Sequence, residues 1–270
     1  MSPVNPVNRV LDDLLVDLAT ESHLLRTAVA TADAWSRATP AQGWTVATQV
    51  AHLVWTDEVA TIAAGAGTEK GKAAWDAVVL KAIENPTGFV DASAHELAAL
   101  PPAELLGRWD LARAGLVTAL WAQPAGTRMP WFGPPMSPTS MATARFMETW
   151  AHGLDVYETI GAVPEPTDRV RHVAHIGVRT RDFAYANNGL EAPAEEFRVE
   201  LTGPSGAVWT WGPEDAAQRV TGEAYDFCRL VTQRIHRDDT SLKAVGDDAE
   251  RWLTIAQAFA GPAGGGRDPR

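Results

Sequence analysis

Glu148 and His152, two residues of types that bind metal ions, lie four positions apart in a segment expected to be helical. Residues at this spacing lie one turn apart on the same helix face, and Asp155 extends that face. A carboxylate and an imidazole on one rigid helix can bind a divalent ion together. Such pairs also occur on helices without a metal, where they are solvated or cap the core.

A second histidine, His52, lies within the apolar run Val50-Ala51-His52-Leu53-Val54, which should face the interior of a helical bundle. A buried imidazole needs a partner, and a metal ion shared with Glu148 and His152 is one candidate. Two histidines and one carboxylate would leave an open coordination position, as in catalytic zinc sites. The alternative is a core histidine that is hydrogen-bonded to a carbonyl group.

The spacing of apolar residues predicts the helices that would carry these side chains. Helices are expected at residues 8–38, 46–64, 72–84, 103–122 and 138–161, with a shorter one starting at a Ser93/Glu96 capping box. Thr45 and Ser137 are candidate N-caps, and Gly161 is a candidate C-terminal stop. We therefore expect a mainly α first domain, residues 1–163, in which His52 comes from a different helix than Glu148.

The second part of the chain is less regular and should combine helices with a small sheet. Its elements are expected at residues 168–186 (helix or strand), 197–211 (hairpin), 214–235 (helix) and 246–260 (helix). Pro164 and Pro166 indicate a linker. We therefore expect a small α+β domain at residues 164–262, followed by a disordered tail at residues 263–270 that is rich in Gly and Pro.

The composition excludes several classes of protein. The 270 residues include 34 acidic and 23 basic side chains, for a formal charge of −11, without a basic cluster. This argues against nucleic-acid partners and an anionic membrane surface. No run approaches roughly 18 apolar residues, and the start lacks a signal-peptide pattern, so we expect a cytoplasmic protein. The single cysteine, Cys228, excludes Cys-rich metal sites and an intramolecular disulfide.

The segments around the three candidate ligands resemble those of the mycothiol-dependent maleylpyruvate isomerase family of actinobacteria. The resemblance rests on Gly43-Trp44-Thr45-Val46, Val50-Ala51-His52-Leu53 and Glu148-Thr149-Trp150-Ala151-His152-Gly153-Leu154-Asp155. It implies a DinB-like four-helix bundle followed by a small α+β C-terminal domain. It also implies that His52, Glu148 and His152 bind Zn²⁺, although the same donor set could hold Fe²⁺ or another divalent metal.

The chemistry that the resemblance implies uses the thiol of mycothiol as a co-substrate. A thiol that binds zinc loses its proton, although free thiols have a pKa of roughly 8.5. In an isomerase the thiolate adds to an activated double bond, the bond rotates and the thiol leaves. In a transferase the S-conjugate is kept. Cys228 lies far along the chain and is more typical of a small core residue than of a nucleophile.

Cationic side chains are expected near the ion if the substrate is a small dianion such as maleylpyruvate. Arg145 lies three residues before Glu148 and could act catalytically in this way, or could pair with that carboxylate. Arg179 and Arg181 could bind the cofactor from the second domain, or could belong to an exposed charged face. These three arginines are therefore candidate site residues.

The loop before the last helix of the first domain contains Trp131 and Phe132 within the segment 129–136. Such a loop can form an apolar wall for a cofactor or a large substrate, or plug the end of a bundle. Asp155 is the best candidate for a general base.

Two alternatives to a thiol-dependent enzyme remain. One is a hydrolase or lyase whose metal activates water, and the other is a non-catalytic, metal-stabilised binding protein. The substrate is expected to be a small molecule, and the sequence leaves its identity and the oligomeric state open.

Overall fold

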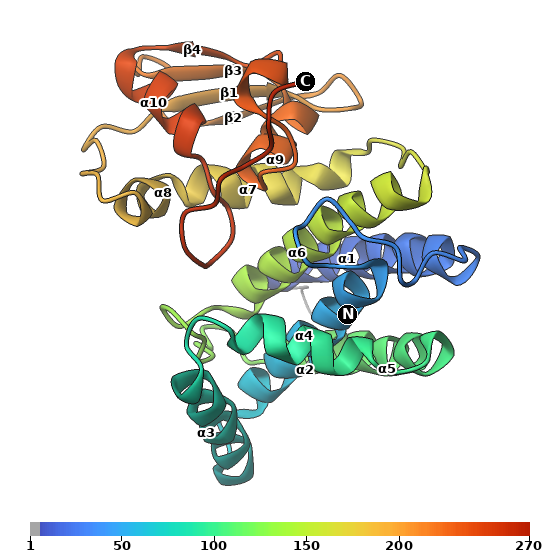
Figure 1. Ribbon diagram of the computed structural model, residues 1–270. Helices are drawn as coiled ribbons and strands as arrows, with labels where there is room; N and C mark the ends of the chain where they lie inside the picture. Colours follow the sequence, from blue (N-terminus) through green and yellow to red (C-terminus); the bar gives the residue numbers. More distant parts are fainter. Residues whose placement is uncertain (1–5) are drawn as a thin grey trace. The chain divides into compact units, whose positions relative to one another are not determined.

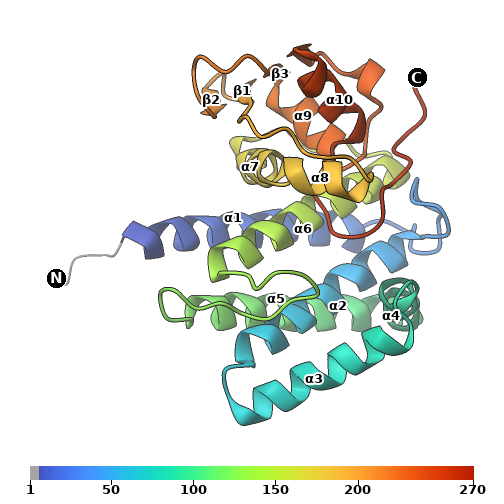
Figure 2. The ribbon, with the colours of Figure 1, turned by 90° about the vertical axis from the view of Figure 1, so that its left-hand side faces the viewer.

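The computed structural model describes residues 6–270, which divide into two compact units between Val163 and Pro164 (Figure 1). The regular elements of the described part of the first unit are helices, joined by loops that contain two isolated β-bridges. Its helices are α1 (Pro6–Ala30), α2 (Val46–Gly65), α3 (Glu69–Glu84), α4 (Phe89–Ala98), α5 (Pro102–Trp121) and α6 (Pro138–Ile160). The four longest helices form the bundle, in which α2 packs on α5 and α6 while α1 packs on α6 and α5. Helices α3 and α4 lie against α2 (Figure 2).

Local capping fixes where the two site-bearing helices begin. The Thr45 side chain accepts the backbone N–H of Thr48 at the start of α2. The Ser137 side chain accepts the backbone N–H of Ser140 at the start of α6. At the end of α6, Gly161 adopts φ 72°, a left-handed conformation that glycine reaches without steric cost. All three predicted caps are therefore confirmed.

The core of the bundle is made of apolar residues from each of its four helices. Among its buried members are Leu25, Val50, Leu53, Leu105, Trp109 and Val156. The first helix ends at Ala30, so the prediction that it continues to residue 38 was wrong. Trp35 packs against the core from the connecting segment, and this made the apolar period look longer than the helix is.

The second unit combines helices with a four-stranded sheet. Its elements are η1 (Asp168–Val170), α7 (Arg171–Arg179), α8 (Arg181–Asn187), β1 (Arg198–Thr202), β2 (Val208–Trp211), β3 (Arg219–Glu223), α9 (Ala224–Val231), η2 (Arg237–Asp239), β4 (Lys243–Val245) and α10 (Asp247–Ile255). The strand order is β2-β1-β3-β4, and β1 is antiparallel to β2 and parallel to β3. Helix α9 packs on β1 and β3. The predicted hairpin is confirmed, and residues 168–186 are helical.

The prediction of one helix over residues 214–235 was wrong. Residues 219–223 form β3, whose Val220 is fully buried between β1 and β4, and only residues 224–231 are helical. The last helix is also shorter than predicted and ends at Ile255. Residues 263–270 contain no helix or strand, and their disorder stays a prediction.

These elements confirm the predicted fold class, a four-helix bundle followed by a small α+β part. Within residues 6–270, every helix is too short or too polar to cross a membrane.

Candidate metal centre

The structure brings the three predicted ligands together. His52 lies on α2, while Glu148 and His152 lie on the facing helix α6. Glu148 Oε2 is 3.2 Å from His52 Nε2 and 3.0 Å from His152 Nε2. One potential ligand atom from each residue lies within 4.8 Å of the other two. The i, i+4 spacing on α6 and the packing of α2 on α6 together produce this cluster.

The cluster has the dimensions and donors of a small divalent-metal site. Zinc bonds of about 2.0–2.2 Å in a tetrahedron place neighbouring ligand atoms roughly 3.3 Å apart, close to the separations of 3.0 and 3.2 Å here. The Nδ1 of His152 donates to Gln49 Oε1 at 2.5 Å, so the Nε2 of a neutral imidazole carries an electron pair. That electron pair faces a carboxylate oxygen, an arrangement that a proton or a cation between them would stabilise.

Glu148 is ionised at neutral pH, as a metal ligand must be. Burial opposes its ionisation. The contacts of its carboxylate with His152 and His52, which stabilise the negative charge when the facing Nε2 atoms carry a proton, and the charge of Arg145 outweigh that effect. The pKa of Glu148 therefore lies well below its usual range. The site carries its own anionic donor without needing an external base.

Gln49, which the sequence did not single out, connects His152 to Asp155. The Nε2 of Gln49 is 3.4 Å from Asp155 Oδ2 and 2.9 Å from Thr39 Oγ1. Its signal in the sequence is a polar side chain about one turn before His52, directly preceding the apolar pair Val50-Ala51. Asp155 lies behind Gln49 and is 1% exposed. The contact between Asp155 and Gln49 fits a role in supporting the candidate ligand His152 better than the predicted role of Asp155 as a general base at the metal.

The ring of His52 is held by aromatic packing. Trp44 and Trp55 lie 5.3 Å and 6.3 Å from the imidazole, measured between ring centroids. Trp44 also stacks on His152 at 5.6 Å. Among the described residues, Nδ1 of His52 has no hydrogen-bonding partner.

Asp57 and Glu58, the acidic residues that follow His52 on α2, bind side chains other than the candidate ligands. Asp57 accepts the indole N–H of Trp109, and Glu58 forms a two-bonded ion pair with Arg108. Burial is the largest influence on Asp57 and raises its pKa to about 7, although Arg145 and Trp109 act in the opposite direction.

Arg145 lies beside the ligands but is incompletely paired. Its Nη2 is 4.0 Å from Glu148 Oε1, and its Cζ lies 5.5 Å from the ring centroid of Trp131. The residue is 5% exposed, yet within the described residues its Nε and Nη1 lack hydrogen-bonding partners. A buried guanidinium with unsatisfied donors is costly, and a carboxylate of a ligand would satisfy it.

Aromatic side chains continue from the loop before α6 to the candidate ligands. We call this series the aromatic wall; its members are Trp55, Trp75, Phe89, Trp131 and Phe132. Trp131 and Phe132 both contact Trp75, and Phe132 also contacts Phe89. Phe89 meets Trp55 edge-on at 5.1 Å, and Trp55 packs on His52. The loop residues Trp131 and Phe132 are therefore linked to the candidate metal centre through packed rings.

The other two predicted arginines belong to the second unit. Arg179 is exposed at the end of α7. Arg181 donates to the side chain of Asp182 and to two backbone carbonyls, and it lies 4.4 Å above the ring of Phe197. Both arginines line a cavity of about 230 Å³ within this unit. Most of the hydrogen-bonding capacity of Arg181 is thus used in holding its own unit together.

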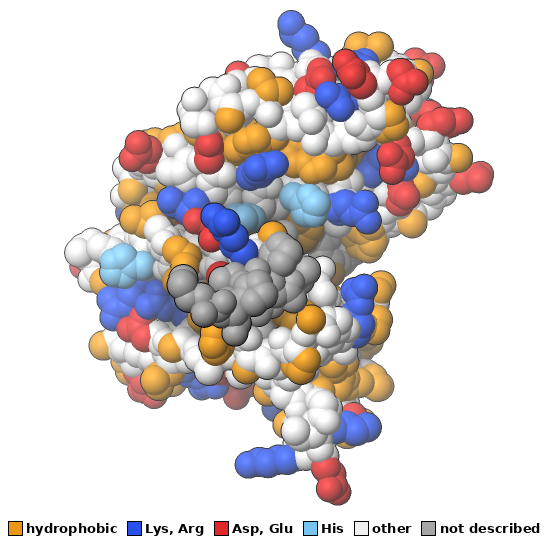
Figure 3. Space-filling model, turned by 180° about the vertical axis from the view of Figure 1, so that it is seen from behind, with side chains coloured by type: hydrophobic (Ala, Val, Ile, Leu, Met, Phe, Trp, Pro, Cys, Tyr) orange, Lys and Arg blue, Asp and Glu red, His pale blue; other side chains and the backbone are white. Residues whose placement is uncertain are grey.

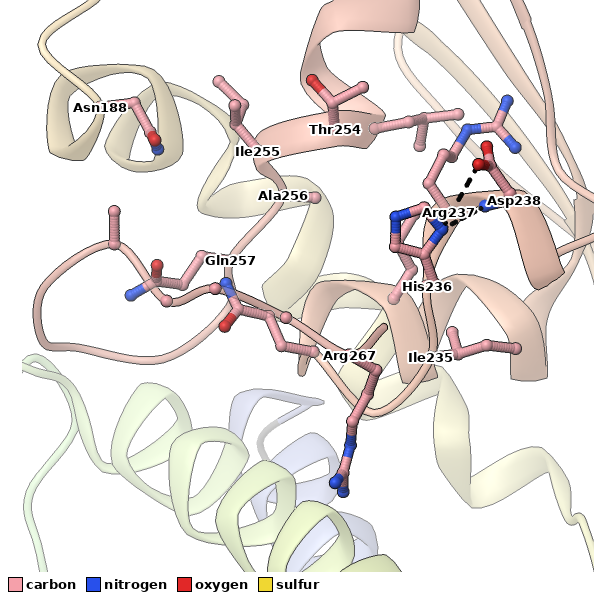
Figure 4. A pocket seen from close by; sticks show the side chains of 17 residues that line it. Asn188, Ile235, His236, Arg237, Asp238, Thr254, Ile255, Ala256, Gln257 and Arg267 are labelled. Atoms are coloured by element: carbon pink, nitrogen blue, oxygen red, sulfur yellow. Dashed lines mark hydrogen bonds and ion pairs between the residues drawn. The ribbon is translucent and has the colours of Figure 1, made fainter. Parts of the chain in front are cut away.

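Two further features of the second unit use residues outside the predicted set. A cavity of about 370 Å³ lies between the end of α10, η2 and the segment 263–267 (Figure 4). There His236 Nδ1 accepts the backbone N–H of Asp238.

Cys228 is fully buried, its thiol donates to the carbonyl of Val170, and burial raises its pKa well above the usual range. This cysteine is a core residue.

Comparisons with known proteins agree with the architecture. Residues 16–157, more than half of the chain, match the mycothiol maleylpyruvate isomerase N-terminal domain, and residues 193–244 match a model described as wyosine base formation. Uncharacterized proteins from two strains of Mycobacterium tuberculosis, CDC 1551 / Oshkosh and ATCC 25618 / H37Rv, are 55% identical over 255 residues. In both cases the match covers 94% of this chain and 97% of the relative.

A solved structure shows the same fold at low sequence identity. The crystal structure of a mycothiol-dependent maleylpyruvate isomerase matches with a TM-score of 0.56 and 15% identity, covering 87% of this chain and 92% of that one. A mutant of that enzyme matches with the same values. The N-terminal domain match, together with this shared fold, shows that the chain belongs to the mycothiol maleylpyruvate isomerase family.

Proposed function

We propose that the protein is a zinc-dependent enzyme that uses mycothiol, or a related small thiol, to isomerise or S-conjugate a small organic electrophile. The observation that carries this proposal is the convergence of His52, Glu148 and His152 on one point between α2 and α6. Membership of a family that includes mycothiol-dependent isomerases supports the thiol as co-substrate. A bound zinc ion would supply an open position at which a thiol loses its proton.

The remaining residues of the site would bind and orient the electrophile. The free N–H groups of Arg145 can donate to an anionic group, most effectively to a carboxylate with two oxygens. Trp131 and Phe132 of the aromatic wall can pack against the carbon skeleton and limit access of water. Trp44 packs on both imidazoles, which keeps the ligand side chains in place.

The experiment that tests this function compares turnover with and without the thiol. The zinc-loaded protein is incubated with maleylpyruvate, and with a small panel of electrophilic alkenes and epoxides, in the presence or absence of mycothiol. We expect conversion that requires mycothiol and that is lost in His52→Ala. Conversion that proceeds equally well without a thiol would contradict the proposal and favour metal-activated water, the chemistry of a hydrolase or lyase.

A further inference from the structure

A chain of buried polar groups runs from Asp155 through Gln49 to the candidate ligand His152. Asp155 Oδ2 is 3.4 Å from Gln49 Nε2, and Gln49 Oε1 is 2.5 Å from His152 Nδ1. Gln49 is 0% exposed and Asp155 is 1% exposed. Because Gln49 and Asp155 are buried, they depend on partners within the protein for hydrogen bonds.

The partners of Gln49 determine which way its amide points. The Oδ2 atom of Asp155 accepts a hydrogen bond from the Gln49 amide nitrogen. The hydroxyl of Thr39 donates its proton to the carbonyl of Trp44, so towards Gln49 it can only accept. Both neighbours of the amide nitrogen are therefore acceptors, and they use its two N–H bonds. Reversing the amide would place its carbonyl oxygen against two acceptors and leave His152 Nδ1 as the one atom facing its N–H groups.

The direction of the amide in turn determines the tautomer of His152. Since Gln49 presents its carbonyl oxygen to Nδ1, that nitrogen must carry a proton. The electron pair of a neutral His152 then lies on Nε2, the atom that faces Glu148 and the proposed metal position. The opposite tautomer would place the proton on Nε2 and block binding of a metal there.

We propose that Gln49 and Asp155 are positioning residues of the metal centre, which together hold His152 in its metal-binding tautomer. This inference rests on the proposed function, because it takes His152 as a ligand. His52 has no such support, since its Nδ1 lacks a partner among the described residues. The hydrogen-bonded support of the site therefore comes from the His152 side, whereas His52 is held by packing against Trp44 and Trp55.

The test uses three variants of the full chain. Gln49→Met removes the amide but keeps a similar shape, whereas Gln49→Glu retains an oxygen that can accept the Nδ1 proton and can share one proton with Asp155. Gln123→Met is the matched control, because Gln123 lies in the same unit and its amide donates to the backbone carbonyls of Ala64 and Ala119, away from the candidate ligands.

Two quantities are measured, and neither requires turnover. The first is the ¹⁵N chemical shift of the His152 ring nitrogens in the metal-free protein, which reports whether Nδ1 carries a proton. We expect a proton on Nδ1 in wild type, Gln49→Glu and Gln123→Met, and its loss from Nδ1 in Gln49→Met. The second is Zn²⁺ affinity by competition with a chelator, which should fall about 10- to 100-fold in Gln49→Met only.

Unchanged Nδ1 protonation and unchanged Zn²⁺ affinity in Gln49→Met would overturn the inference. A fall in Nδ1 protonation and Zn²⁺ affinity in Gln49→Glu as large as in Gln49→Met would also overturn it. If Gln49→Met does not fold, the double variant Thr39→Val/Asp155→Asn gives the same test, because neither remaining neighbour then fixes the direction of the Gln49 amide. A wild-type protein that binds no Zn²⁺ would refute the proposed function, while the Nδ1 measurement would still decide the role of Gln49.

Discussion

At the scale of single residues, Arg145 is the side chain whose environment points most clearly to a ligand. It is buried beside Glu148 with two donor nitrogens unsatisfied within the described chain. We expect Arg145→Met to raise KM for an anionic electrophile and to lower kcat/KM about tenfold or more, since a hydrogen bond to a charged group contributes about 1.5–3 kcal/mol. Steady-state kinetics, with zinc content measured in parallel, check this. An unchanged kcat/KM at full zinc content would contradict the role of Arg145.

Asp57 makes a prediction about the pH dependence of stability. Burial raises its pKa to about 7 in the folded protein, above the value of about 3.9 for an unfolded chain. Between these values the folded state binds a proton that the unfolded state lacks, so this group lowers the free energy of unfolding as pH rises from about 4 to about 7. Above about pH 7, Asp57 is ionised in both states, and its destabilising contribution to the free energy of unfolding no longer changes with pH.

Asp57→Asn removes this titration and keeps an oxygen that can accept the indole N–H of Trp109. The free energy of unfolding of the variant minus that of wild type should therefore be more positive near pH 8 than near pH 5. Urea unfolding at the two pH values measures the difference. An identical difference between variant and wild type at both values would show that Asp57 does not titrate in this range.

Local signals made His52, Glu148 and His152 candidates, namely an i, i+4 Glu–His pair and a histidine within an apolar run, and the family resemblance joined them into one ligand set. It could not predict Gln49. A neutral amide gives no charge or motif, and its role depends on the register in which α2 packs on α6. For the same reason, the sequence did not show that Asp155 reaches Gln49.

At the scale of elements, the loop between α5 and α6 joins the aromatic wall to the ligand helix. Trp131 stacks on Trp75 and lies under the Arg145 guanidinium. We expect Trp131→Ala to lower kcat/KM roughly two- to tenfold, because one aromatic contact contributes about 0.5–1.5 kcal/mol. Zinc content should stay near the wild-type value.

Circular dichroism and zinc analysis of the Trp131→Ala protein separate the two interpretations of this loop. A folded, zinc-containing protein with weakened turnover supports a wall that contacts the substrate. Loss of helical signal or of zinc would instead show that the loop plugs the end of the bundle.

The elements that the sequence mispredicted are those defined by distant partners. Residues 219–223 read as part of a helix, but they pair in parallel with β1 and antiparallel with β4. A parallel pairing across an intervening crossover leaves no local turn signal. By contrast, α2 and α6 have side-chain N-caps at Thr45 and Ser137, so their starting points were predictable to within a residue.

At the scale of the whole molecule, the predicted fold class is confirmed and the family is shown by the N-terminal domain match. Acidic, basic and apolar side chains intermingle on the face that Figure 3 presents. The formal charge of −11 disfavours the binding of a polyanionic partner.

The central claim is that His52, Glu148 and His152 bind one metal ion, and elemental analysis tests it most directly. Wild type and His52→Ala are purified in parallel without a chelating tag and analysed for zinc, iron and other divalent metals. We predict about one zinc ion per wild-type chain and almost none in the variant, because the loss of one of three protein ligands removes several kcal/mol of binding free energy. A wild-type protein without metal, or a variant that retains its zinc, would contradict the claim.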